Sequence, residues 1–152
     1  MNSNLHGLEQ PFGSQYVLRG FLGKGSMGRV YRGEVRAGGP DVAVKVLRDA
    51  LAGQPAVVAR FIQERQVLRA VTHPNVVTVR DLVVEGDQLG IVMDLVAGGD
   101  LRKAVPFPTT TDRALPIIAA IADGLAAVHA AGVVHRDLKP ENVLADTGPD
   151  GQ

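Results

Sequence analysis

Near the end of the chain, three side chains that are suited to chemistry stand within six residues of one another. Residues 133–144 read V-V-H-R-D-L-K-P-E-N-V-L and contain Asp137, Lys139 and Asn142. A carboxylate can accept a proton, and a lysine can neutralise charge that develops during a reaction. An amide oxygen suits a hard divalent cation. The three residues are therefore candidates for a catalytic group.

A glycine-rich turn lies far upstream of this stretch. Residues 22–30 read L-G-K-G-S-M-G-R-V, which fits G-x-G-x-x-G-x-V. The same glycine spacing opens dinucleotide-binding folds, where a helix follows. Here residues 29–35 contain β-branched and aromatic side chains, so we expect a strand instead. Backbone amides of such a hairpin can approach phosphates. From the spacing alone, an ordinary hairpin turn is an equal alternative.

A lysine in the next predicted strand could also meet phosphates. Residues 42–45 read V-A-V-K, and strand alternation places Ala43 and Lys45 on one face. Ala43 leaves room for a flat base, while Lys45 offers a mobile cation. The alternative is a solvated lysine at the edge of a sheet.

The following helix offers a partner for this lysine. Phe61, Glu64 and Leu68 are spaced so that Glu64 lies on or beside the apolar stripe of the helix. An unpaired carboxylate there would cost several kcal/mol, by order of magnitude, and Lys45 is its natural partner. The alternative is that Glu64 lies at the edge of the stripe and makes only pairs on the helix surface.

Taken together and in this order, the three motifs resemble the protein kinase family, in particular its bacterial, eukaryotic-like serine/threonine branch. Lys139, two residues after Asp137, matches the serine/threonine type. The resemblance runs from about residue 16 to 146. It implies transfer of the γ-phosphoryl group of ATP, with Mg²⁺, to serine or threonine hydroxyls of protein substrates.

The resemblance also implies individual roles. Asp137 would accept the proton of the substrate hydroxyl, Lys139 would neutralise the transferring phosphoryl group, and Asn142 would bind Mg²⁺. His135 is expected to pack as a structural residue. Met93 would be the gatekeeper of the hinge. The implied ATP-binding residues are Leu22, Gly23, Gly25, Gly28, Val30, Ala43, Lys45, Glu64, Met93, Asp94, Val96 and Leu144.

The elements that must position these residues indicate an α+β fold of the protein-kinase type. We expect an N-lobe with a five-stranded antiparallel sheet and helix C, followed by an incomplete, mainly helical C-lobe. The predicted strands are residues 16–22, 29–35, 41–47, 76–84 and 88–93, and the predicted helices are 55–71, 100–105 and a long one to 131 that threonines 109–111 cap. The predicted domains are a flexible leader at 1–15, the N-lobe and hinge at 16–97, and the partial C-lobe with helices D and E and the catalytic loop at 98–152.

Composition limits the alternatives. The 152 residues carry a formal net charge of zero and no cysteine, which gives no electrostatic reason to expect nucleic acid and excludes thiol chemistry. A cytoplasmic location is expected. Residues 114–134 are apolar, but Pro116, Asp123, His129 and two glycines interrupt them, so we expect a buried helix in preference to a membrane segment.

The 152 residues contain no D-F-G motif, activation segment or A-P-E motif. Three hypotheses follow: a serine/threonine kinase whose sequence is truncated after the catalytic loop, an inactive pseudokinase fragment that binds a nucleotide or a partner, and a dinucleotide-dependent oxidoreductase. The first explains every motif. In the first two, the long apolar helix would expose a surface through which the chain could self-associate.

Overall fold

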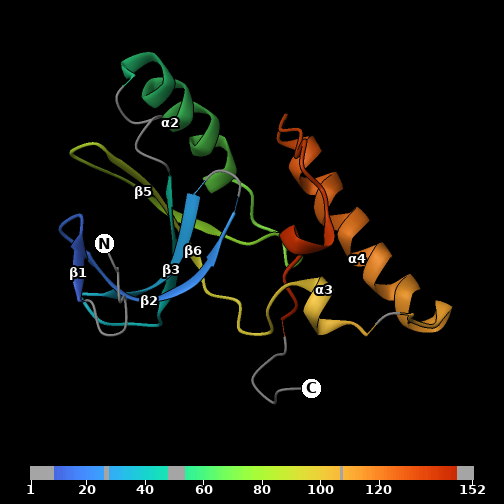
Figure 1. The fold of residues 1–152 in the computed structure, drawn as a ribbon. Coiled ribbons are helices and arrows are strands. Elements are labelled where there is room, and N and C mark those ends of the chain that lie inside the picture. The colour runs from blue at the N-terminus through green and yellow to red at the C-terminus, as the bar shows by residue number, and fades with distance from the viewer. Residues whose placement is uncertain (1–8, 26–27, 48–53, 107, 147–152) are drawn as a thin grey trace. The chain divides into compact units, whose positions relative to one another are not determined.

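The computed structural model describes residues 9–25, 28–47, 54–106 and 108–146 (Figure 1). Within the helix at 55–69, three side chains are not among those described, namely Val57, Arg60 and Glu64. The described residues form two compact units. Unit 1 comprises residues up to 69 together with 79–95, and unit 2 comprises residues 70–78 together with those from 96 onward. Each unit is described by itself.

Unit 1 is built on an antiparallel sheet of six strands (Figure 1). The strands are β1 (Gln10–Phe12), β2 (Tyr16–Lys24), β3 (Gly28–Val35), β4 (Val42–Leu47), β5 (Val79–Glu85) and β6 (Gln88–Asp94). Their order across the sheet is β1-β2-β3-β4-β6-β5. The five strands from β2 to β6 match the predicted ones, and the predicted antiparallel sheet is confirmed apart from the number of strands.

The additional strand is β1, which pairs antiparallel with β2. The prediction of a flexible leader is therefore wrong for residues 10–12. The physical reason is burial, because the side chain of Phe12 is 0% exposed. An aromatic ring that is removed from water in this way holds its backbone in place.

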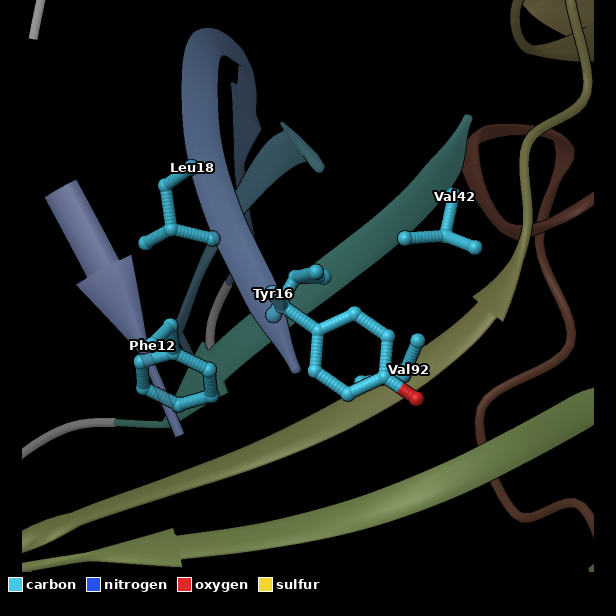
Figure 2. Packing of buried hydrophobic residues seen from close by; sticks show 6 residues of the cluster. Phe12, Tyr16, Leu18, Val42 and Val92 are labelled. Atoms are coloured by element: carbon cyan, nitrogen blue, oxygen red, sulfur yellow. The ribbon is translucent and has the colours of Figure 1, made fainter. Parts of the chain in front are cut away.

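The core of unit 1 lies on one face of the sheet. Strand alternation directs Val42 and Val44 of β4 to this face, and both are fully buried. Figure 2 shows Val42 with Phe12 of β1, Tyr16 of β2 and Val92 of β6. The buried cluster consists of Phe12, Tyr16, Leu18, Val42, Val44 and Val92. The opposite face of β4 carries Ala43 and Lys45 and is therefore free of this cluster.

Helix α2 (Pro55–Arg69) belongs to unit 1 and packs against β5. Pro55 is its first residue, a position where a proline costs no hydrogen bond. Its bounds agree with the predicted helix over 55–71 within two residues.

Unit 2 contains α3 (Leu101–Ala104), α4 (Thr111–Ala130) and the short 3₁₀ helix η1 (Pro140–Asn142). Asp100 caps α3, since its side chain accepts a hydrogen bond from the amide of Lys103. Thr110 is the N-cap residue of α4 but makes no side-chain capping bond. The predicted capping by threonine therefore holds for the position and not for the hydrogen bond.

Helix α4 exposes much of its apolar surface within the described residues. Leu115 and Ile118 are each 58% exposed, whereas Gly124 and Val128 are its buried residues. The expected burial of this helix is thus not met here, and the expected exposed apolar surface is present. By length and composition alone the helix could cross a membrane, with a mean hydropathy of 1.4 over 18 residues. Core helices of soluble proteins satisfy the same two criteria.

A loop of unit 2 docks closely on α4. A Cβ atom placed on Gly124 would lie 2.6 Å from the carbonyl oxygen of Asn75, so only glycine permits this approach. The Nε2 atom of His73 lies 3.3 Å from a carboxylate oxygen of Asp123 on α4. The loop of residues 73–75 therefore belongs with the helical unit, although it precedes β5 in the chain.

Candidate functional site

Four of the predicted ATP-binding residues share one face of the sheet in unit 1. The strand register pairs Val30 with Lys45 and Ala43 with Met93. Directly opposed residues of an antiparallel pair point to the same face, and Ala43 and Lys45 are two residues apart on β4. The four side chains therefore lie together on the face opposite the hydrophobic core.

The glycine-rich turn is a hairpin between β2 and β3, as predicted. The amide of Gly25 donates a hydrogen bond of 2.9 Å to the carbonyl oxygen of Gly28. Ser26 and Met27, at the tip, are outside the described residues. Leu22, on β2 just before the turn, is 51% exposed. A strand follows this turn, which contradicts the dinucleotide-binding alternative because that fold needs a helix there.

The three glycines of the turn differ in what surrounds them. A Cβ atom on Gly28 would lie 2.2 Å from the carbonyl oxygen of Val46, so this glycine permits close packing of β3 on β4. A Cβ atom on Gly23 would have no neighbour within 4 Å, and one on Gly25 would meet only Gly28, at 4.0 Å. The backbone at Gly23 and Gly25 is therefore open to a ligand, whereas Gly28 has a packing role that the motif did not reveal.

Lys45 is half-buried on β4. Its predicted partner, Glu64, lies on α2, but the side chain of Glu64 is outside the described ones. The pair between Lys45 and Glu64 therefore stays a prediction.

The strand that leads to the predicted hinge is held by an ion pair. The carboxylate of Asp94, at the end of β6, accepts a hydrogen bond from Nε of Arg80 on β5. This bond ties the last residue of β6 to its neighbouring strand. Arg80 was not identified from the sequence, because its pairing depends on a register that includes a bulge between Val79 and Asp81.

In unit 2, the catalytic-loop candidates are joined by direct contacts. The Nζ atom of Lys139 lies 3.2 Å from Oδ2 of Asp137. The amide nitrogen of Asn142 donates to the same oxygen at 3.0 Å and to the carbonyl oxygen of Asp137 at 2.7 Å. The three residues that the sequence singled out therefore meet around one carboxylate.

The backbone before Asp137 has an unusual conformation. Arg136 has a φ of 63°, and it is the only residue other than glycine with a positive φ in the part of the chain that the structure describes. Such a conformation is strained for an arginine and tends to occur at functional sites. Nδ1 of His135 accepts a hydrogen bond from the amide of Asp137 at 3.3 Å. His135 is exposed, so within the described residues it braces the loop and is not packed as expected.

The electrostatics of the loop keep Asp137 ionised. The ammonium group of Lys139 and the amide of Asn142 lower the pKa of Asp137 from its ordinary value of 3.8. Its side chain is 57% exposed, so it is accessible to a substrate. An exposed, ionised carboxylate with oriented neighbours can accept a hydrogen bond from an incoming hydroxyl group.

Helix α3 is fastened to the end of the catalytic loop. The amide of Leu101 donates to the carbonyl oxygen of Val143 at 2.7 Å, and Asp100 forms a β-bridge with Leu144. Arg102 pairs with Glu141 at 2.6 Å. The pKa of Glu141 is lowered by a hydrogen bond from its own backbone and then by Arg102. Sequence reasoning missed Arg102 and Glu141, since the contact joins residues 39 positions apart.

In the catalytic loop, Asn142 is suited to provide one ligand to a magnesium ion. Because the amide nitrogen of Asn142 is used in hydrogen bonds to Asp137, its Oδ1 atom is the one suited to a hard cation. Among the described residues, no group of three or more His, Cys, Asp or Glu side chains could hold a metal ion. Asn142 therefore fits Mg²⁺ only alongside other ligands, such as phosphate oxygens.

The sheet, the glycine-rich hairpin and the catalytic loop together define the protein kinase class. The family model of the protein kinase domain matches residues 16–150, and the chain belongs to this family. It is 51% identical over 149 residues to serine/threonine-protein kinase PkaB of Streptomyces coelicolor, covering 95% of this chain and 35% of PkaB. It is 44% identical over 132 residues to serine/threonine-protein kinase pkn2 of Myxococcus xanthus, covering 86% of this chain and 16% of that protein.

Solved structures give the same family. The PknI kinase domain of Mycobacterium tuberculosis is similar with a TM-score of 0.79 and 31% identity, covering 93% of this chain and 58% of that one. The chain thus spans about a third or less of the length of the curated relatives it matches and somewhat more than half of this solved kinase domain.

Proposed function

We propose that the protein is an ATP-dependent serine/threonine protein kinase that transfers the γ-phosphoryl group to serine or threonine hydroxyls of proteins. The observation that carries this proposal is the arrangement of Lys139 and Asn142 around the carboxylate of Asp137. The likeness to named serine/threonine kinases supports the choice of acceptor.

In this proposal each residue of the loop has one task. Asp137 orients the acceptor hydroxyl and accepts its proton, and its lowered pKa favours the ionised form that this requires. Lys139 neutralises charge on the phosphoryl group as it moves. When bound, Mg²⁺ neutralises and orients the phosphates, and Asn142 offers it Oδ1.

The face of the sheet that carries Ala43, Lys45, Val30 and Met93 would receive the nucleotide. Ala43 and Val30 leave an apolar surface for the adenine ring, and Lys45 supplies a cation for phosphate oxygens. The open backbone of Gly23 and Gly25 permits amides to approach the phosphates. The resemblance also assigns to this proposed site four further residues of unit 1, namely Leu22, Gly28, Glu64 and Asp94. Val96 and Leu144 belong to unit 2, and their role in nucleotide binding stays a prediction.

An alternative proposal is a pseudokinase module that binds a nucleotide or a partner. The observation that favours it is the apolar surface of α4 in the described residues, where Leu115 and Ile118 are each 58% exposed. The exposed apolar residues of α4 would then serve self-association. A cytoplasmic location is proposed in either case, from the absence of cysteine.

The deciding experiment incubates the full-length protein with γ-labelled ATP, Mg²⁺ and a generic protein substrate, followed by phosphoamino-acid analysis. The proposal expects label on phosphoserine or phosphothreonine that depends on Mg²⁺. Nucleotide binding without any transfer would favour the module, and label on phosphotyrosine would contradict the serine/threonine assignment. For the 152 residues alone we expect no transfer.

A further inference from the structure

Strand β1 lies before the residues that match the family model of the kinase domain. The family model begins at Tyr16, whereas β1 spans Gln10–Phe12. Phe12 is nevertheless among the largest fully buried side chains of the molecule. A strand of three residues is too short to be stable through its own hydrogen bonds. Its position must therefore come from what Phe12 and its neighbours contact.

The ring of Phe12 fills the space over Gly90 on β6. A Cβ atom placed on Gly90 would lie 2.3 Å from Cε1 and 2.6 Å from Cζ of Phe12. The absence of a side chain at Gly90 therefore makes room for this ring. Gly90 lies three residues before Met93 on the same strand. Figure 2 shows the Phe12 ring with Tyr16 and Val92 in the core.

The segment also joins the two opposite edges of the sheet. In the strand order, β1 is at one edge and β5 at the other. The amide of Gly13, just after β1, donates a hydrogen bond to the carboxylate of Glu85 at the end of β5. The hydroxyl group of Tyr16 donates to Asp81 of β5 at 3.0 Å. The sheet is thus curled until its edges meet.

Gly13 is suited to this closure by its conformation. Its φ of +63° is in the left-handed region, and a Cβ atom there would lie 2.9 Å from a methyl group of Val83. The turn after β1 can therefore approach β5 closely only with glycine. The two glycines thus have separate roles: Gly90 makes room for the Phe12 ring, and Gly13 allows the turn to approach Val83 of β5.

We propose that residues 9–16 are a clasp that closes the sheet and positions β6, and with it Met93 and Asp94 at the start of the predicted hinge. The closure depends on the packing of the Phe12 ring over Gly90. Both are positioning residues, because neither lies on the face of the sheet that carries Lys45. The expected effect on nucleotide affinity rests on the proposed function, whereas the closure of the sheet does not.

The closure is tested by a double-mutant cycle in the full-length protein. Phe12→Ala removes the ring and is expected to lower the melting temperature by about 6 to 20 °C. Gly90→Ala is expected to lower it in the parent protein, since the added methyl group meets the ring. In the Phe12→Ala background the same Gly90→Ala change is expected to have no effect or to raise it, because the methyl group then enters a vacated space.

The controls match these two changes. Gln10→Ala alters an exposed residue of the same strand, and Gly20→Ala adds a methyl group at a position with no neighbour within 4 Å. Both are expected to leave the melting temperature nearly unchanged. If Phe12→Ala does not fold, Phe12→Leu replaces it in the cycle. If Gly90→Ala lowers the melting temperature equally in the parent protein and in the Phe12→Ala variant, the proposed closure is overturned.

Positioning of β6 is tested by nucleotide affinity, measured with Mg²⁺ and a non-hydrolysable ATP analogue well below the melting temperature of each variant. If β6 of the Phe12→Ala variant occupies its correct position for only about a tenth to a third of the time, the apparent Kd of that variant for the ATP analogue rises about three- to tenfold above the parent value. An unchanged Kd for Phe12→Ala would overturn the positioning role and leave the clasp purely structural. Absence of binding by the parent protein would contradict the proposed function and not the closure.

Discussion

The two units of this chain hold their candidate functional residues in different ways. In unit 1, strand register sets the positions of Val30, Ala43, Lys45 and Met93, and the backbone hydrogen bonds of the sheet fix that register. In unit 2, an irregular exposed loop is held by bonds among the functional side chains themselves, around Asp137. Substitutions at the packed strand positions of unit 1 should therefore act through folding, and substitutions in the catalytic loop of unit 2 through charge and chemistry.

The first prediction concerns the close packing of strands in unit 1. Gly28→Ala places a methyl group 2.2 Å from the carbonyl oxygen of Val46, so β3 or β4 must shift. We expect the free energy of unfolding to fall by about 1–3 kcal/mol, which is typical of overpacking. Urea unfolding followed by circular dichroism would measure it.

Gly20→Ala is the matched control, because it adds the same methyl group on β2 where no atom lies within 4 Å. If the two variants are equally stable, unit 1 does not depend on close approach of its strands at the glycine-rich turn. That result would contradict the proposed difference between the two units.

The second prediction concerns pH and the buried tyrosine of unit 1. Burial, followed by the hydrogen bond to Asp81, raises the pKa of Tyr16 from 10.0 to about 12. A raised pKa in the folded state means that the stabilisation is complete below pH 10 and is lost as pH rises toward 12. The loss should be on the order of 1–3 kcal/mol.

Tyr16→Phe removes the titrating group. The difference in unfolding free energy between parent and variant should therefore change between pH 10 and pH 12 and stay constant from pH 7 to 9. A difference that is flat across the whole range would show that the hydroxyl group of Tyr16 is not protonated more strongly in the folded protein.

Much of the fold could be predicted from the sequence, because the period of two in residues 42–47 and the turn residues between strands are local signals. Strand β1 could not, since its stability comes from contacts of Phe12 and Gly13 with residues 70 or more positions away. Three residues that include Pro11 give no periodic pattern. A lone aromatic residue, Phe12, beside a glycine was the one signal available in the sequence.

The site divides in the same way. Asp137, Lys139 and Asn142 could be identified because they lie within one short motif, and the structure brings them together. Arg80 and Arg102 could not, because each depends on a partner in another element. The packing role of Gly28 was hidden by its membership of the glycine motif.

The third prediction concerns the electrostatics of unit 2. Lys139 is the first cause of the lowered pKa of Asp137, so Lys139→Met should raise that pKa toward 3.8. A lowered pKa in the folded state contributes stability above the unfolded value, which is lost as pH falls through the folded one. NMR titration of the Asp137 carboxyl group would measure the shift. Lys103→Met, which removes a cation paired with Asp100 instead, should leave it unchanged.

The central claim is that the carboxylate of Asp137 serves phosphoryl transfer by the full-length protein, and Asp137→Asn tests it most directly. Asparagine keeps the shape of the side chain but cannot accept the proton. We predict that transfer to a protein substrate falls by about 10²- to 10⁴-fold, while the melting temperature falls by no more than about 2–4 °C, because the lost ion pair with Lys139 is exposed. Asp87→Asn, in the exposed turn between β5 and β6, should change neither. Transfer by Asp137→Asn at the parent rate would contradict the account.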